Sequence, residues 1–202
     1  MTDLFIKGGV LMWPILLCSV AAITVILERS IYFLLHRDSS RLLKRAQEKM
    51  DARKFDDAAG ILSKSKGPIS RFLTAMIVER KLGEKEYTAA VTAGGEKILF
   101  SMDRGLFVLT LVERIAPLIG FLGTVIGMII TFIDVAGADG PVRAADLAGG
   151  IWQALITTAG GLIVAIPALF FHHLFDTCIS RKAGTMKQMA GTLMVAIQGK
   201  KK

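Results

Sequence analysis

The sequence lacks the features by which a disulfide-rich secreted domain or an enzyme is usually recognised. Only two cysteines occur, Cys18 inside an apolar run and Cys178 beside a basic segment, which argues against a disulfide framework. No glycine-rich phosphate loop and no histidine or cysteine set with metal-ligand spacing is visible. His172 and His173 are adjacent, so their rings diverge on a helix and suit an interfacial position. We therefore expect no enzyme, no metal and no cofactor.

Charge is absent from three long stretches. The runs Val10–Leu27, Ile115–Ile133 and Ile151–Phe171 contain 18, 19 and 21 residues and no Asp, Glu, Lys, Arg or His. A helix needs roughly 20 apolar residues to cross the hydrocarbon core of a bilayer. With 52% hydrophobic residues overall, the sequence predicts a membrane protein with three spanning helices. The first run is expected to be an uncleaved anchor, because no small-residue cleavage site follows it.

The positive charge is distributed unevenly along the chain. The segment His36–Arg114 holds 16 of the 25 basic residues, and six more follow Phe171, whereas the stretch between the second and third runs holds only Arg143. Cytoplasmic loops are enriched in Lys and Arg, so we expect the N-terminus outside and the C-terminus inside. The basic cluster after the first run is expected to contact anionic lipid headgroups, and no nucleic acid is expected as a partner.

Helical periodicity continues between the runs, and strand alternation of convincing length is absent. Breaks are expected at Gly67-Pro68 and around Gly83. From Tyr87 the pattern runs on without a strong breaker before Pro117, which predicts one long helix from the cytoplasm through the membrane. The predicted fold is all-α, with three transmembrane helices, the second and third extended into the cytoplasm. The expected segments are the N-terminal segment with the first transmembrane helix (1–35), a cytoplasmic helical region (36–114), the second transmembrane helix (115–135), a periplasmic loop (136–150), the third transmembrane helix (151–175) and a cytoplasmic C-terminal helix and tail (176–202).

On a helical wheel, the second and third runs each separate bulky side chains from small and polar ones. The bulky face is expected to meet acyl chains, and the small face other helices, because glycine lets backbones approach closely. Threonine and glutamine on the small face fit two uses: hydrogen bonds between helices, or an ion path in which hydroxyl groups replace water. The expected helix-packing residues are Pro117, Gly120, Gly123, Gly127, Gly160, Gly161 and Pro167, and the candidates for the ion path are Thr124, Thr131, Gln153 and Thr158.

No side chain inside the runs can titrate near neutral pH, and Asp134 lies only at the outer edge of the second run. Proton-coupled membrane machines normally hold an ionisable group inside the membrane. A proton-driven function would therefore need a carboxylate supplied by a partner. Three spans enclose little lumen, so both the packing and the ion-path interpretations favour an oligomer.

The segments PLIGFLGTVIGM (Pro117–Met128) and ALITTAGGLIVAIPA (Ala154–Ala168) resemble the paired core of the MotA/TolQ/ExbB proton-channel family. The segment Gly8–Arg29 resembles the first span of ExbB-type members. The resemblance implies an inner-membrane subunit that forms a homo-pentamer around two helices of an ExbD/TolR-type partner, which supplies a membrane aspartate. It also implies that the proton-motive force drives work at the envelope, through a TonB-like protein in ExbB-type systems. TolQ-like envelope maintenance, and a gliding or secretion motor, are the alternatives.

By position, the resemblance makes Thr124 and Thr158 the pore threonines of the second and third spans. Gln153 stands where ExbB and TolQ usually have a glutamate, and an amide cannot titrate near neutral pH. Sodium stays open beside the proton as the ion, because amide and hydroxyl oxygens can coordinate it. A non-conducting membrane scaffold, in which the threonines only pack, stays open as the alternative function.

Overall fold

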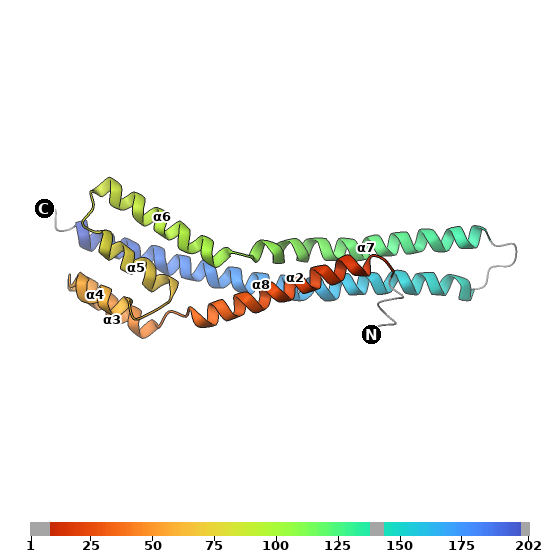
Figure 1. Ribbon diagram of the computed structural model, residues 1–202, viewed down its shortest axis with the longest axis horizontal. Coiled ribbons are helices and arrows are strands. Elements are labelled where there is room, and N and C mark those ends of the chain that lie inside the picture. The colour runs from red at the N-terminus through yellow and green to blue at the C-terminus, as the bar shows by residue number, and fades with distance from the viewer. Residues whose placement is uncertain (1–8, 138–143, 199–202) are drawn as a thin grey trace. The chain divides into compact units, whose positions relative to one another are not determined.

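A computed structural model describes residues 9–137 and 144–198 (Figure 1). Its elements are α2 (Met12–Leu35), α3 (Ser40–Asp51), α4 (Phe55–Leu62), α5 (Pro68–Glu79), α6 (Glu84–Asp103), α7 (Leu106–Ala136) and α8 (Ala144–Gln198). Within these two ranges the chain forms helices and no strand, which confirms the all-α prediction. The chain divides into two compact units. The apolar unit comprises the described residues up to Glu28 together with Gly105–Leu174, and the polar unit comprises Arg29–Arg104 together with the described residues from Phe175.

Within the described ranges, three helices are long and apolar enough to cross a membrane: Met12–Leu35, Leu106–Ala136 and Leu147–Ile197. The three predicted spans are thereby confirmed by length and composition. Helix α8 continues to Gln198, as expected for a tail that extends the third span. It also begins at Ala144, so the last seven residues of the expected loop, 144–150, are helical instead. The expected loop residue Arg143 lies outside the described residues.

The prediction of one long helix from Tyr87 into the second span is wrong. Helix α6 ends at Asp103, and α7 begins only at Leu106. Between them Gly105 has a φ of +85°, a left-handed conformation that glycine adopts without steric cost. The hydrophobic pattern continues across this joint, so periodicity alone did not reveal the break.

A buried arginine of α2 satisfies the carbonyl groups at the end of α6. The guanidinium of Arg29 donates to the backbone oxygens of Ser101 and Met102, at 3.1 and 3.3 Å. The last carbonyls of a helix have no partner within the helix. A basic side chain placed there can donate hydrogen bonds to them, and its positive charge interacts favourably with the negative end of the helix dipole. Only 3% of the surface of Arg29 is exposed, so these bonds are held away from water within the polar unit.

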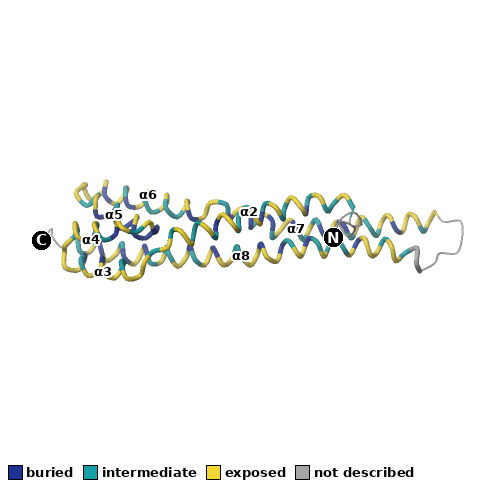
Figure 2. Tube along the Cα trace, turned by 60° about the horizontal axis from the view of Figure 1, so that its bottom comes forward, coloured by how far each residue is buried: buried dark blue, intermediate teal, exposed yellow. Residues whose placement is uncertain are grey.

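The core of the polar unit is formed by α3, α4, α5, α6 and the end of α8 (Figure 2). Helix α3 contributes Leu43, Ala46 and Met50, at the three- and four-residue spacing of one helix face. Helix α5 begins at Pro68, directly after Gly67, and α6 begins directly after Gly83, so both predicted breaks are confirmed. Proline at the first helical position costs no hydrogen bond, because that backbone nitrogen has no partner within the helix.

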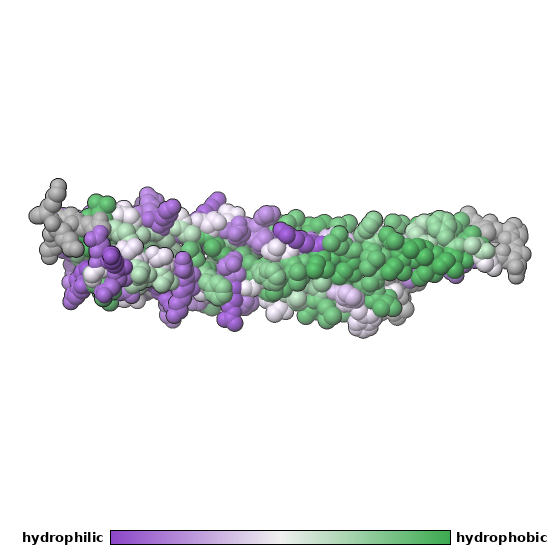
Figure 3. Space-filling model, turned by 90° about the horizontal axis from the view of Figure 1, so that it is seen from above, coloured by the Kyte–Doolittle hydropathy of each residue, from purple (hydrophilic) through white to green (hydrophobic). Residues whose placement is uncertain are grey.

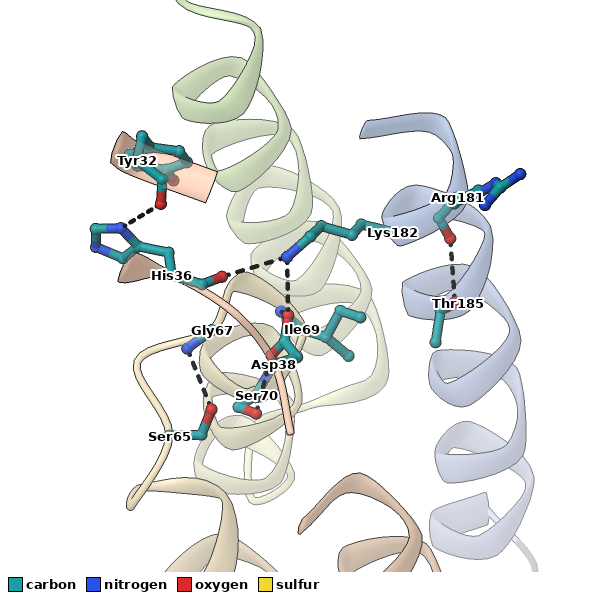
Figure 4. A network of polar contacts seen from close by, with 10 residues as sticks. All are labelled: Tyr32, His36, Asp38, Ser65, Gly67, Ile69, Ser70, Arg181, Lys182 and Thr185. Atoms are coloured by element: carbon teal, nitrogen blue, oxygen red, sulfur yellow. Dashed lines mark hydrogen bonds and ion pairs between the residues drawn. The ribbon is translucent and has the colours of Figure 1, made fainter. Parts of the chain in front are cut away.

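Asp38 connects the start of α5 with α8 inside the polar unit (Figure 4). Its carboxylate accepts hydrogen bonds from the backbone N–H groups of Ile69 and Ser70, at 3.4 and 3.1 Å, and from the Ser70 hydroxyl, at 3.1 Å. Lys182 of α8 donates from Nζ to Oδ2 of Asp38, at 3.3 Å. The side chain of Asp38 is 6% exposed. One carboxylate therefore caps a helix N-terminus and pairs with a cation of another helix.

In the apolar unit most bulky side chains of the second and third apolar runs point outward, as the helical wheels predict. Figure 3 shows hydrophobic side chains over much of the visible face of this unit. The exposed large side chains of the two wheels include Leu118, Leu122, Ile129, Ile133, Leu155, Ile163, Ile166 and Phe170. Apolar side chains on this scale are expected on a surface that meets acyl chains or other membrane helices.

Candidate functional site

Helices α7 and α8 approach each other so closely that only glycine fits at their crossing. A methyl group added at Gly120 would lie 3.0 Å from the carbonyl oxygen of Thr157 and from the Cα of Thr158. One added at Gly161 would lie 2.5 Å from the carbonyl oxygen of Ala116. Both distances involve backbone atoms, which move only if the helices move apart. We call this contact the α7–α8 seam.

Further small residues extend the seam on the Asp134 side. A methyl group at Gly123 would collide with the side chain of Thr157, and one at Gly127 would lie 3.0 Å from Cβ of Ala154. Thr131 contacts Gly150 of α8. The seam therefore follows the three- and four-residue spacing that places these residues on one face of α7.

The other expected packing residues lie elsewhere. Gly160 faces α2, where an added methyl group would lie 3.5 Å from the sulfur and methyl carbon of Met12. Pro117 is partly buried inside α7, whereas Pro167 is exposed inside α8. Proline provides no backbone donor within a helix, so Pro167 cannot donate to the carbonyl of the preceding turn. The structure thus gives Gly160 a contact with the first span and Pro167 a position on the surface of the chain.

Two adjacent threonines of α8 take different positions. Thr157 is 2% exposed, lies in the seam and donates to the carbonyl of Gln153 in its own helix, at 3.1 Å. Thr158 is partly exposed and donates across the seam to the carbonyl of Gly120, at 2.9 Å. The hydroxyl of Thr158 therefore bonds between helices, in a residue that is partly exposed at the surface of the chain.

The remaining ion-path candidates bond within their own helix or lie at the surface. Thr124 is partly exposed and donates to the carbonyl of Phe121, at 2.6 Å. Thr131 is buried and donates to the carbonyl of Gly127, at 2.8 Å. Gln153 is exposed, and its amide nitrogen would lie 3.1 Å from a methyl group added at Gly9. The single chain therefore places Thr131 in the seam and leaves Thr124 and Gln153 accessible.

A polar cluster that sequence reasoning did not identify lies at the other end of α7. His172 has Nδ1 3.0 Å from Oε2 of Glu113 and Nε2 3.1 Å from Oγ1 of Thr110. The exposed fractions of the His172 and Glu113 side chains are 20% and 11%. The only sequence signal for this cluster was position. Glu113 precedes the second apolar run and His172 follows the third, so both are predicted at the cytoplasmic side of the membrane. Adjacent histidines on one helix gave no reason to select His172, and its partners became visible only from the packing.

Comparison with known proteins indicates the family to which this chain belongs. The model of the family described as "MotA/TolQ/ExbB proton channel family" matches residues 64–188. A putative biopolymer transport protein ExbB-like 1 of Synechocystis sp. is 35% identical to this chain, over 93% of this chain and 74% of its own length. This chain belongs to the MotA/TolQ/ExbB family. The predicted resemblance to ExbB-type members is thereby confirmed.

Other ExbB-named proteins of the MotA/TolQ/ExbB family cover a similar share of the chain. The biopolymer transport protein exbB1 of Vibrio cholerae is 26% identical, over 92% of this chain and 82% of its own length. The biopolymer transport protein ExbB of Salmonella typhimurium is 28% identical, over 90% of this chain and 78% of its own length. The range matched by the family model contains all of α7 and the part of α8 that forms the seam, so the α7–α8 seam lies within the matched range.

Proposed function

We propose that this chain is an ExbB-like subunit of an ion-driven motor in the bacterial inner membrane. It forms a pentameric ring with an ExbD-type partner and couples the proton-motive force to work at the cell envelope, most directly TonB-dependent transport. Family membership supports the class of machine. The observation that carries the assignment in this chain is Thr158, a partly exposed residue whose hydroxyl group is fixed by a bond to Gly120 across the seam.

The partner is required by the chemistry of the spans. The three apolar runs contain no Asp, Glu, Lys, Arg or His that could relay a proton, and Gln153 stands where the family usually has a glutamate. A proton crossing the membrane therefore needs a carboxylate from another chain, which an ExbD-type partner with a membrane aspartate would supply. TolQ-like envelope maintenance, and a gliding or secretion motor, would use the same core of the ring.

Substitution of Thr158 separates a conducting subunit from a scaffold. We expect Thr158→Val to lower ion-driven activity while the complex still assembles, because the interhelical bond contributes only about 0.6–2 kcal/mol. Thr158→Ser keeps the hydroxyl group and should retain most of the activity. Thr24→Val is the matched control, since Thr24 lies in the first span and donates only to Val20 in its own helix, at 2.8 Å.

The measurement is ion flux into vesicles that contain the purified complex, with the yield of complex determined in parallel. Normal flux in Thr158→Val at normal yield would contradict the pore role and favour the scaffold. Loss of complex in Thr158→Val but not in Thr158→Ser would assign the hydroxyl to helix packing instead.

A further inference from the structure

The imidazole of His172 is held at both of its nitrogen atoms by side chains of α7. Nδ1 faces the Glu113 carboxylate at 3.0 Å, and Nε2 faces the Thr110 hydroxyl at 3.1 Å. Thr110 has a second acceptor within reach, because its Oγ1 is 3.2 Å from the carbonyl oxygen of Leu106. All four residues belong to the apolar unit.

This arrangement can hold an extra proton without moving any heavy atom. In the neutral state, Thr110 donates to Nε2, and Nδ1–H donates to the Glu113 carboxylate. When a proton binds to Nε2, the Thr110 hydroxyl turns its hydrogen to the Leu106 carbonyl and accepts from Nε2–H. Nδ1–H stays bonded to Glu113 throughout. Each polar atom is therefore satisfied in both states, and the two states differ by one proton and one hydroxyl rotation.

The charged groups around the site set its net charge. Glu113 contributes the carboxylate in direct contact, and the neighbouring Arg114 is exposed. The expected divergence of the two histidine rings on α8 is wrong, because the ring of His173 stacks on that of His172, with 5.7 Å between ring centroids. Asp176 lies four residues after His172 in the sequence. From α2, Glu28 lies beside the start of α7, with a carboxylate oxygen 3.8 Å from a methyl group added at Gly105. The carboxylate of Glu113 thus neutralises the charge that a proton brings to the ring.

We propose that His172, held by Glu113 and Thr110, is the proton acceptor at the inner end of the ion path. The inference rests on the proposed function. His172 is the first group of α8 beyond the third apolar run that can hold a proton, about 21 Å along the helix from Thr158 at 1.5 Å per residue. Nε2 takes a proton from a hydronium ion in the path, leaving water, and then gives it to water on the cytoplasmic side. No electron is exchanged.

Proton binding is tested first, and independently of transport. The full chain with its partner, carrying ¹³C-labelled histidine in lipid nanodiscs, is followed by NMR as pH is changed, and the His172 signal is assigned by its loss in His172→Gln. We expect the His172 ring to change protonation state over the pH range in which flux changes. Glu113→Gln should change the His172 ring signals, because it replaces the carboxylate that Nδ1 faces at 3.0 Å. A ring that stays in one state, or does not respond to Glu113→Gln, overturns the proposal.

Proton flux then tests the role in transport. Glutamine can hydrogen-bond in place of histidine but cannot bind the proton, so His172→Gln should lower flux at least about tenfold at equal yield of complex. Thr24→Val is again the control, since Thr24 lies outside the site and donates only to Val20 in its own helix, and it should keep normal flux. Unchanged flux in His172→Gln, beside a conducting wild type, overturns the acceptor role and leaves the channel standing. A wild-type complex that passes no protons overturns both.

Discussion

Tyr87 carries its hydroxyl group into the apolar core of the polar unit. The residue is 8% exposed, and its hydroxyl oxygen has no hydrogen-bond partner among the residues that the structure describes. Burial, and secondarily the negative charge of Glu79, raise the pKa of the Tyr87 hydroxyl above its ordinary value. The folded state therefore favours the neutral phenol more strongly than the unfolded state does.

We expect Tyr87→Phe to keep or raise stability, by up to about 1 kcal/mol at pH 7, because it removes an unsatisfied buried polar group. Above pH of about 10 the phenol ionises first in the unfolded chain, so the wild type loses stability as pH rises. Tyr87→Phe should lack this alkaline loss. Thermal unfolding followed by circular dichroism in detergent, from pH 7 to 11, measures both effects. A destabilised Tyr87→Phe at pH 7 would show that the hydroxyl has a partner in the assembled protein.

At the scale of helices, the α7–α8 seam depends on the absence of side chains. Gly161→Ala would place a methyl group against the backbone of Ala116, so the helices must separate. We expect a loss of about 1–3 kcal/mol, the usual cost of overpacking. Gly184→Ala in the same helix is the matched control. It has no neighbouring atom within 4 Å in the described structure and should gain about 0.5–1 kcal/mol of helix propensity.

Thermal unfolding of the two variants in detergent checks this pair of expectations. Opposite shifts of the unfolding temperature are expected, downward for Gly161→Ala and upward for Gly184→Ala. Equal shifts would show that the methyl group at position 161 is accommodated, and the seam would then be looser than the backbone distances indicate.

Sequence patterns predicted the helices better than the contacts between them. Uncharged length predicted the three spans, and Gly67-Pro68 and Gly83 predicted two breaks, because these signals are local. The joint at Gly105 was missed, since an unusual backbone angle leaves no trace in hydrophobic periodicity. The wheels placed Thr157 and Thr158 on the same small face. Only the packing shows that Thr157 is enclosed in the seam, whereas Thr158 reaches across it, and that His172 meets Glu113.

At the scale of the whole molecule, the uneven distribution of Lys and Arg predicts the orientation in the membrane. Alkaline phosphatase, which is active only outside the cytoplasm, should be active when inserted after residue 140 and inactive when fused after Lys202. A fluorescent protein that folds only in the cytoplasm should give the reverse pattern at the same two positions. Phosphatase activity from the fusion after Lys202 would contradict the predicted orientation.

The threonines of the two helices share a property that bears on which ions they can meet. Thr124, Thr131, Thr157 and Thr158 each direct their hydroxyl hydrogen to a backbone carbonyl. A hydroxyl has one hydrogen and two lone pairs. Because the hydrogen is already bonded, each oxygen can act only as an acceptor toward a further group. The hydroxyl groups of the partly exposed residues Thr124 and Thr158 are therefore oriented to attract cations and to repel anions. In the proposed ion path, such hydroxyl oxygens would favour cations over anions before any carboxylate is added.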